Sequence, residues 1–507
     1  MTATILRSLV LGGILLPSFG AGAVEIDANN QPLGEVLQSL GRQAGMEIVV
    51  ADGLASDRIT AQISGQPSSD TLHALLANYN YETIAGDGNL KRVLVSGRNG
   101  DASAAPTFDL LQYRQLPSQL PEKFHGMNPG SVLAVEIPRE QLLAMHTGDR
   151  VSLTLPNGQY TVVHDNRFEH ENGDISWVGF LETAGKAYRV ILTMGPQGSV
   201  GQAVTPDGVF NLEQDGGTTW LVDLNVSGLQ LSALENDDAD PSASDEPPVF
   251  ASAKANRNKN NARLKGTKAT AASSPAVQPV VDLLVLYTAG VKSAPSFTTR
   301  INNLVAKANQ AYLDSRINLK LRVVYSALVN YTETNSNGNA LSELTLGRSA
   351  FSNVGTLRTK YGADLVTLIR PFKYKLQLSC GLAWVNGASG SVMKAGLGYS
   401  VVSDGTDTAS GYYCSDFTLA HELGHNMGSA HDAAHSNVQG KYPFSYGFGA
   451  NGKFGTIMSY YNPAIGFFSS PSLSYTGQAL GNGNADNAKS LNQTAATVAG
   501  FMPSKVK

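Results

Sequence analysis

TLAHELGHNMGSAHD, residues 418–432, is the stretch that decides the fold of the C-terminal part of this chain. His421 and His425 are four residues apart, so on a helix they lie on one face, one turn apart, and both imidazoles can reach one ion. Gly428 can adopt the left-handed conformation that ends a helix, which lets the chain turn back and makes His431 available as a third ligand. The stretch therefore predicts a helix, a turn and three converging histidines.

Three neutral imidazoles with one open position are typical of a catalytic zinc site, because structural sites fill all four positions with protein ligands. Glu422, next to the first histidine, is then the predicted general base: zinc lowers the pKa of water toward about 7 and the carboxylate can accept the proton. The alternative is a surface helix with three incidental histidines. Average residue usage makes that coincidence on the order of once in 10⁵ for a chain of this length. The sequence thus favours Zn²⁺ and peptide-bond hydrolysis.

HELGHNMGSAHD matches the metzincin pattern HExxHxxGxxH, and the aspartate after the third histidine resembles the reprolysin-type branch. This resemblance implies a methionine-containing turn under the metal, which carries over to Met458 in GTIMSYY; ordinary core packing is the alternative. It also implies a buried hydrogen-bonding role for Asp432 near that turn. Tyr460 has the spacing at which astacin- and serralysin-like metzincins place a tyrosine that stabilises the oxyanion, although reprolysins usually lack it. His435 is assigned to a loop.

The sequence around this stretch is similar to that of the bacterial peptidyl-Asp metallopeptidases, with CGLAWVNG before the helix and PFSYGF and GTIMSYYNP after it. The similarity covers nearly all of residues 280–502 and implies cleavage on the N-terminal side of acidic residues. A pocket for an acidic side chain needs a fixed positive charge, because a buried carboxylate without a partner is costly. The candidates are Lys441 and Lys453, with Arg370 third.

The chain divides into several predicted domains. Residues 24–97 mix helical and strand patterns, which predicts a small α/β module; it resembles the short N-terminal domain of secretins and TonB-dependent receptors, which implies a secretion or envelope partner. Residues 108–231 show short alternating runs between turn residues, typical of a β-rich domain. Residues 232–279 are acidic, then basic, and poor in apolar residues, which predicts a disordered linker. Residues 280–502 alternate strand and helix, which predicts an α/β metzincin domain with a mixed, mostly parallel sheet.

The histidines of the β-rich domain have no metal-ligand spacing among them, so they are assigned to surface or loop positions: His125, His146, His164 and His170.

Residues 1–23 are typical of a signal peptide. Arg7 precedes an apolar run, and Ala21-Gly22-Ala23 supplies small residues for cleavage, which predicts an exported protein, secreted or periplasmic. The apolar run is too short to span a membrane. The two cysteines, Cys380 and Cys414, are predicted to form one disulfide in an oxidising compartment, with two free thiols as the alternative.

Bulk composition limits the remaining classes. A chain of 507 residues exceeds one hydrophobic core, and 42% apolar with 15% charged residues indicates folded protein. A formal net charge of -4 offers no concentrated basic face, so nucleic acid is not a predicted partner. The predicted partners are protein or peptide substrates.

Two functions compete on these grounds. The first is an exported zymogen in which residues 108–231 restrain the protease; no cysteine precedes Cys380, so a cysteine ligand cannot block the metal. The second is a catalytically inert envelope-assembly or binding protein acting through residues 24–97, and Glu422 argues against it. An enzyme that cuts before acidic residues would also cut its own linker, at one of four aspartates: Asp237, Asp238, Asp240 and Asp245.

Overall fold

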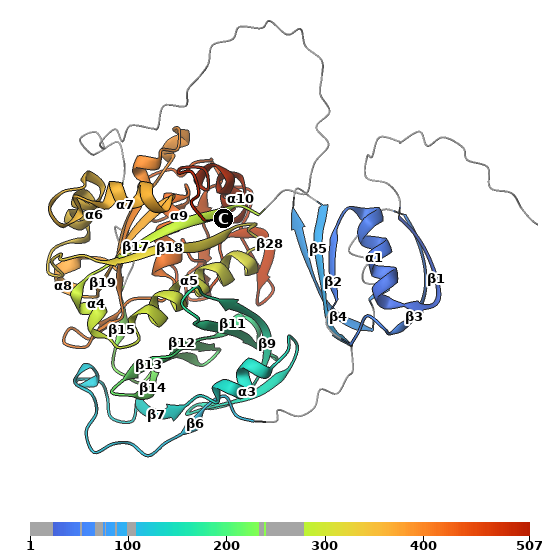
Figure 1. The fold of residues 1–507 in the computed structure, drawn as a ribbon, viewed down its shortest axis with the longest axis horizontal. Helices are drawn as coiled ribbons and strands as arrows, with labels where there is room; N and C mark the ends of the chain where they lie inside the picture. The colour runs from blue at the N-terminus through green and yellow to red at the C-terminus, as the bar shows by residue number, and fades with distance from the viewer. Residues whose placement is uncertain are drawn as a thin grey trace, which may run out of the picture. The chain divides into compact units, whose positions relative to one another are not determined.

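The computed structural model of this chain describes residues 24–50, 53–65, 75–76, 78–86, 89–98, 108–232, 238–239 and 278–506. The chain divides into two compact units, Met1–Ser103 and Ala104–Lys507 (Figure 1). The predicted signal peptide and most of the predicted linker lie outside the described residues. Among the described residues, no helix combines the length and apolar character that crossing a membrane requires.

The first unit surrounds one amphipathic helix with two small sheets. Helix α1 (Leu33–Ala44) buries its leucines and ends at Gly45, whose φ is 65°. One sheet pairs β1 (Val24–Pro32) with β3 (Arg58–Gly65); the other has the order β2 (Glu47–Val50), β5 (Asn89–Arg98), β4 (Tyr79–Gly86). Residues 66–74, whose sequence also carries a helical pattern, lie outside the described residues.

The second unit begins with a β-rich domain built on a nine-stranded sheet. The order is β6-β7-β14-β13-β12-β11-β10-β9-β8, antiparallel throughout. Its elements are β6 (Gln112–Tyr113), η1 (Glu122–Phe124), β7 (Val132–Glu136), α3 (Arg139–Ala144), β8 (Arg150–Leu155), β9 (Gly158–Glu169), β10 (Ile175–Leu181), β11 (Gly185–Gly195), β12 (Gly198–Thr205), β13 (Gly208–Asp215) and β14 (Thr218–Asp223).

The two outer strands of this sheet meet at one short segment. Asp109 bridges Ser152 on β8, and Leu110 donates its backbone N–H to the Ser152 carbonyl over 2.7 Å. Three residues later, β6 pairs with β7 at the opposite end of the sheet. The segment therefore closes the sheet into a barrel, and the alternating inward side chains of its strands fill the interior with apolar residues.

One histidine of this barrel was assigned wrongly from sequence. His164, expected at the surface, is only 3% exposed and stacks on Trp177, with ring centroids 5.1 Å apart. It lies on β9 among the buried positions of the strand, because the alternation of that strand turns it inward. Burial lowers its pKa from the usual value, so the neutral ring suits this position.

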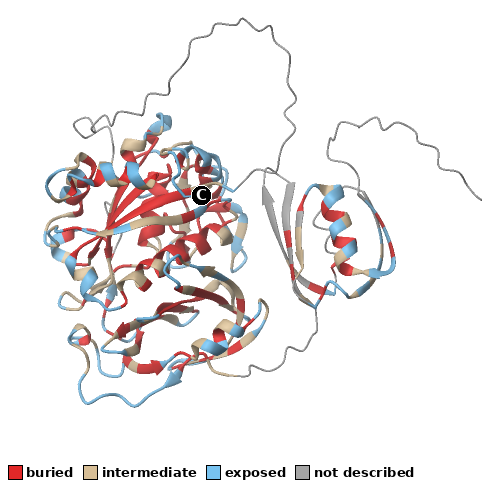
Figure 2. Ribbon diagram, in the orientation of Figure 1, coloured by how far each residue is buried: buried red, intermediate tan, exposed pale blue. Residues whose placement is uncertain are grey.

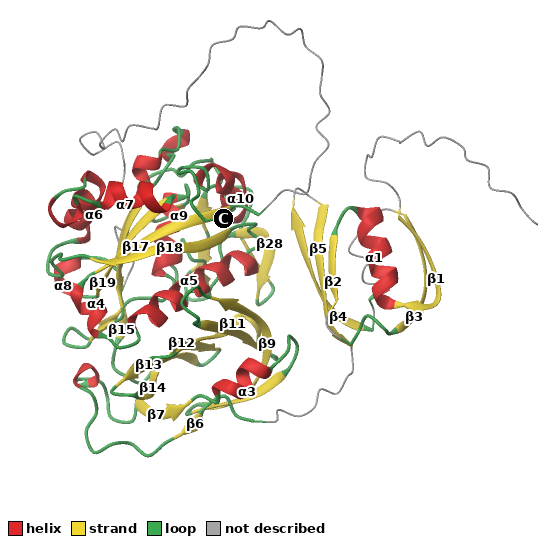
Figure 3. Cartoon of the chain, in the orientation of Figure 1, coloured by secondary structure: helices red, strands yellow, loops and turns green. Residues whose placement is uncertain are grey.

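The remainder of the second unit is an α/β domain. Four strands run parallel in the order β21-β19-β17-β18, and β20 lies antiparallel against β21. These strands are β17 (Val280–Tyr287), β18 (Lys320–Leu328), β19 (Leu365–Pro371), β20 (Gly381–Trp384) and β21 (Tyr399–Asp404). Strand β17 is apolar along nearly its whole length because helices cover both faces of the sheet (Figure 3).

The helices of this domain are α4 (Ala289–Ser293), α5 (Phe297–Asp314), α6 (Asn337–Leu346), α7 (Val354–Tyr361), α8 (Tyr374–Gln377), α9 (Thr418–Asn426) and α10 (Asn487–Val498), with η2 (Ser349–Phe351), η3 (Ala388–Gly390) and η4 (Ala395–Leu397). The short strands are β22 (Thr406–Asp407), β23 (Tyr412–Tyr413), β24 (Ala430–Asp432), β25 (Tyr446–Gly447), β26 (Gly449–Ala450), β27 (Phe454–Gly455), β28 (Ser470–Tyr475) and β29 (Gln478–Leu480). Helices α5, α9 and α10 share one core cluster with β17, whereas α6 and α7 lie over the other face.

Part of the predicted linker has regular structure, which corrects the expectation of disorder from residue 232 onward. Strand β15 (Gln230–Leu231) pairs with β23, and the buried Ser232 donates its N–H to the Tyr413 carbonyl over 2.8 Å. Strand β16 (Asp238–Ala239) then adds to β20 as the outermost strand of the α/β sheet. Both pairings use backbone groups of distant segments, which composition and charge cannot predict.

Helix α5 lies between the barrel and the α/β sheet (Figure 1), and it is buried along most of its length (Figure 2). Its barrel-facing side is polar. The buried Lys307 ammonium donates to Gln202 of β12 and to Asp416, each over 2.6 Å. Asn303 donates to Thr193 of β11 over 3.0 Å. These buried hydrogen bonds fix the position of the barrel on the α/β domain.

Ion pairs lie on both sides of this contact. Arg189 of the barrel pairs with Asp314 at the end of α5, and all of these charged groups are less than one-tenth exposed. On the other side Arg300 and Lys307 both contact Asp416. Burial alone would raise the pKa of the Asp416 carboxyl, but the two cations outweigh it and hold that pKa well below its usual range.

Candidate active site

The three predicted histidines come together at the buried end of α9. His421 and His425 lie one turn apart on that helix, Gly428 adopts a φ of 96°, and β24 brings His431 back toward them. Their Nε2 atoms are 3.1, 3.1 and 2.9 Å apart, and all three side chains are fully buried. The structure therefore gathers these three nitrogens around one point.

Backbone carbonyls fix the tautomers of two of these rings. Nδ1 of His421 lies 2.6 Å from the Ile457 carbonyl, and Nδ1 of His425 lies 3.0 Å from the Ser429 carbonyl. A carbonyl only accepts, so Nδ1 carries the proton and Nε2 presents its lone pair to the shared point.

This donor set fits a zinc ion. Nitrogens that present lone pairs cannot hydrogen-bond to one another, so a bound cation would stabilise their approach. Tetrahedral zinc with Zn–N near 2.0–2.1 Å would place its ligand atoms about 3.3–3.4 Å apart. The observed separations are close to that value, and the carbonyl partners orient the rings as expected for metal-ligating histidines.

Glu422 lies where strand β20 passes α9. The carboxylate is buried, and a Cβ added at Gly381 would lie only 2.1 Å from its Oε1 atom. Just beyond the strand, Asn386 donates its N–H to the His425 carbonyl over 3.0 Å. Glycine at position 381 thus lets the backbone of β20 approach the carboxylate directly.

The segment that contains Met458 forms the floor beneath the histidines. Met458 is fully buried, and a Cβ at Gly424 of α9 would meet its sulfur at 2.6 Å. Its neighbour Ile457 provides the carbonyl that orients His421. Met458 packs below the site and supplies shape rather than a ligand atom.

Asp432 connects this floor to the third histidine. Its Oδ2 accepts hydrogen bonds from the Ser459 hydroxyl over 3.0 Å and from the Tyr460 N–H over 3.1 Å. Its Oδ1 lies 2.7 Å from Nδ1 of His435. The carboxylate is 4% exposed and holds the residue after His431 against the turn.

Tyr460 places its hydroxyl at the histidine cluster. The hydroxyl oxygen lies 3.2 Å from Nε2 of His431, and the two ring centroids are 4.4 Å apart. A phenol at this distance can donate a hydrogen bond to an oxygen atom that forms beside the metal position.

Comparison with known proteins agrees with this geometry. Residues 278–485 match the model of the family described as Metallo-peptidase family M12B Reprolysin-like. This part of the chain is called the reprolysin-like domain below, after the family that it resembles. Residues 116–226 match the BamI lipocalin-like domain, which corresponds to the barrel.

Several curated relatives carry the name peptidyl-Asp metalloendopeptidase. One from Pseudomonas aeruginosa is 29% identical over 265 residues, which covers 47% of this chain and 43% of the relative. One from Stenotrophomonas maltophilia is 32% identical over 211 residues, covering 39% of this chain and 46% of the relative. The chain thus spans about half the length of these relatives. The crystal structure of metalloproteinase-II from Bacteroides fragilis aligns with a TM-score of 0.40 and 8% identity, over 71% of this chain and 94% of that one, a likeness too low to support an inference.

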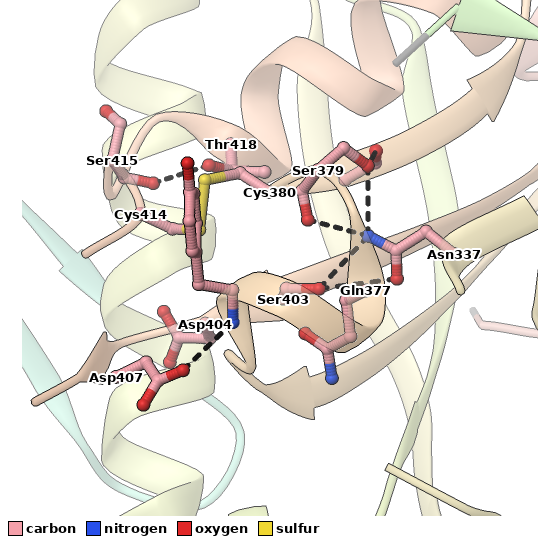
Figure 4. The surroundings of a disulfide bond; sticks show 12 residues. Asn337, Gln377, Ser379, Cys380, Ser403, Asp404, Asp407, Cys414, Ser415 and Thr418 are labelled. Atoms are coloured by element: carbon pink, nitrogen blue, oxygen red, sulfur yellow. Dashed lines mark hydrogen bonds between the residues drawn. A yellow bond between two sulfur atoms is a disulfide. The ribbon is translucent and has the colours of Figure 1, made fainter. Parts of the chain in front are cut away.

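The predicted disulfide is present in the reprolysin-like domain. Cys380, directly before β20, is bonded to Cys414, and the described residues contain no free cysteine. Around it, the Asn337 amide donates to the Ser379 carbonyl over 2.9 Å and to the Ser403 hydroxyl over 3.1 Å (Figure 4). These bonds fix the chain just before Gly381, where β20 approaches Glu422.

The three candidate cations for substrate selectivity lie in different settings. Arg370 is fully buried, donates to Asn335 and Asn337, and has its pKa lowered by burial to about 10. Lys441 donates to the backbone carbonyls of Gly390 and Ser391 over 3.2 and 2.8 Å. Lys453 is exposed. Of the three, Arg370 is committed to interior hydrogen bonds, which makes it the weakest candidate.

Sequence reasoning missed two residues of this site. His435 lies in a turn, in agreement with its assignment to a loop, but the bond of its ring to Asp432 was not predicted; the three-residue separation of an acid and a histidine was the available signal. Gly381 lies 41 positions before Glu422, and nothing local in the sequence indicates their contact.

Proposed function

We propose that the chain is an exported zinc endopeptidase whose reaction takes place at His421, His425, His431 and Glu422. The observation that carries this proposal is the convergence of three Nε2 atoms at 2.9–3.1 Å, two of them with tautomers fixed by backbone carbonyls. Such a set has a clear use as a three-histidine metal site with an open position. The family match over residues 278–485 supports it.

Glu422, Tyr460 and the edge of β20 each have a separate role in the proposed hydrolysis. A zinc ion in the site would act as a Lewis acid that polarises a peptide carbonyl and acidifies water. Glu422 accepts the proton of the attacking water and later returns it to the leaving amine. The Tyr460 hydroxyl donates a hydrogen bond to the oxyanion, and the edge of β20 aligns the substrate backbone beside Glu422.

Two observations support a substrate class: the names of the relatives, and the two candidate cations Lys441 and Lys453. Relatives at 27–32% identity are named peptidyl-Asp metalloendopeptidases, which supports cleavage before acidic residues. Lys441 or Lys453 would supply the charge that binds the acidic side chain. The first 23 residues support export to the periplasm or the medium, and the secretin-like module at residues 24–97 would serve a partner of the envelope.

A metal analysis of four purified full-length proteins tests the division of roles. We expect wild type and Glu422→Ala to bind one zinc per chain, and His421→Ala to lose tight binding. Casein hydrolysis should fall about 10²- to 10⁴-fold in Glu422→Ala, because the base alone is lost. His146→Ala, whose ring is 79% exposed, is the control and should keep both metal and activity. Equal activity of wild type and Glu422→Ala would overturn the proposal.

Tyr460→Phe tests the oxyanion donor. The substitution removes one hydroxyl and leaves the ring against His431, so zinc content should stay the same while kcat falls about 10²-fold with KM little changed. An unchanged kcat would confine Tyr460 to packing.

Substrate selectivity calls for a matched peptide pair. Two fluorogenic peptides that differ only by Asp or Asn after the scissile bond should differ at least tenfold in kcat/KM with wild type. Lys441→Met and Lys453→Met, measured on the same pair, then identify the cation: the responsible variant loses the preference but still cuts the Asn peptide. A peptide pair cut equally well would remove the acidic preference from the proposal.

A further inference from the structure

Strand β16 occupies the outer edge of the sheet beside the active site. Asp238 pairs with Ala383 and Ala239 with Trp384, and Val385 donates its N–H to the Ala239 carbonyl over 3.1 Å. Among the described residues, β20 would be the edge strand of the sheet if β16 were absent. Two residues from the segment between the barrel and the reprolysin-like domain therefore cover an edge that would otherwise present free backbone groups.

That edge lies next to Glu422. Gly381, where β20 touches the carboxylate, is two residues before Ala383, a separation of about 7 Å along a strand. An exposed strand edge binds extended peptides by adding them as a further strand. A substrate backbone that aligns on β20 and reaches Glu422 thus needs the same backbone groups that β16 already uses.

The covering strand is held close on its barrel side. Strand β15 pairs with β23. Ser232, six residues before Asp238, donates its N–H to the Tyr413 carbonyl. Six residues span at most about 20 Å, so β16 remains near β20 even when unpaired. A short tether of this kind gives an effective concentration in the millimolar range.

We propose that Asp238–Ala239 is an inhibitory strand that competes with substrate for the edge of β20 in the uncut chain. The proposal rests on the proposed function, because it assumes that substrates align on this edge. It also supplies a form of latency that needs no cysteine. The segment pairs over two residues and runs parallel to β20, and parallel pairing is slightly weaker than antiparallel pairing. A longer peptide that adds antiparallel displaces it once the tether is lost.

A binding measurement in the inactive Glu422→Ala background tests this without turnover. The probe is a fluorescein-labelled peptide with the sequence of residues 233–245, ALENDDADPSASD. Ala239→Pro removes a backbone N–H and fixes φ within β16, which a paired strand tolerates poorly. Ala243→Pro makes the same chemical change four residues later and is the control. We expect the Ala239→Pro protein to bind the probe at least tenfold more tightly than the control protein.

Hydrogen exchange at Val385 provides the second readout. Its amide donates to Ala239, so exchange should become faster in the Ala239→Pro protein and slow again when the probe is added. Equal probe affinity for the two proline variants would overturn the proposal, as would a Val385 amide that exchanges at the same rate in both. If the proposed function failed, the wild-type protein would lack zinc or activity. Probe binding and hydrogen exchange need neither zinc nor activity, so the two failures can be told apart.

Discussion

The barrel and strand β16 both contact the reprolysin-like domain, and they do so in opposite ways. The barrel contacts α5 through buried charges and hydrogen bonds between side chains, among them Arg189 with Asp314 and Gln202 with Lys307. Strand β16 uses two residues and backbone groups alone. Backbone pairing at an edge can be exchanged for another strand, whereas a buried ion pair cannot lose one partner cheaply. The chain thus separates the contact that holds the barrel from the contact that covers the edge of β20.

Removing Asp416, the carboxylate that pairs with Lys307 where Lys307 bonds to the barrel, should have the largest effect. Asp416→Ala leaves Lys307 buried without its carboxylate, which is expected to cost about 3–5 kcal/mol of unfolding free energy. Urea unfolding followed by circular dichroism measures this. Asp149→Ala, which removes an acid that is 52% exposed, should cost less than about 1 kcal/mol. A similar loss for both variants would mean that the buried pair of Lys307 and Asp416 contributes no more to stability than an exposed acid.

The same carboxylate predicts a pH dependence. The Asp416 pKa is lowered in the folded protein from its usual value of 3.8, so its contribution to stability is fully present above about pH 4. It is lost as the pH falls from there toward the folded pKa, because the unfolded state then binds more protons. The difference in unfolding free energy between wild type and Asp416→Asn should therefore shrink steadily below pH 4. A difference that stays constant down to pH 2 would contradict this assignment.

The disulfide links the two contact regions and should contribute nearly as much. Cys414 lies two residues before Asp416, and Cys380 directly precedes β20. The bond closes a loop with a sequence separation of 34, worth about 3–4 kcal/mol in the chain-entropy model. Thiol titration of the denatured protein should find no free sulfhydryl, and reduction should lower the unfolding free energy by that amount. Two titratable thiols would count against the bond.

Disrupting β16 should have the smallest effect on stability. Ala239→Pro in the Glu422→Ala background is expected to change the unfolding free energy by less than about 1 kcal/mol, since only a two-residue pairing is lost. The comparison therefore predicts a variant that binds peptides differently and unfolds almost as before. A loss as large as that of Asp416→Ala would show that β16 is structural rather than exchangeable.

The convergence of the three histidines could be predicted from sequence because the relevant spacing is local. His421 and His425 are separated by one helical turn, and a left-handed glycine returns the chain to His431 within six residues. The alternation of strand and helix patterns in residues 280–502 likewise predicted the α/β domain to which α5 and β17 belong. These features depend on neighbours in the chain, which the sequence displays directly.

The missed features depend on contacts between distant segments. Strand β16 lies in a charged stretch that composition assigns to disorder, and only the free edge of β20, 145 positions further on by residue number (383 against 238), gives it a pairing partner. The polar side of α5 was equally unexplained, because Lys307 and Asn303 have meaning only against Gln202 and Thr193 of the barrel. The alternation of β9 turns His164 inward, and its stacking partner Trp177 lies on the neighbouring strand β10.

Strand β16 precedes residues 240–277 in the chain rather than following them. A cut within that interval leaves the strand on the same fragment as the barrel, so one fragment keeps both the holding contact and the covering strand. Its return to the reprolysin-like domain is then a bimolecular reaction between two separate molecules. Latency after such a cut depends on protein concentration: a confined, concentrated enzyme stays covered, and the same enzyme released into a large volume becomes active by dilution alone.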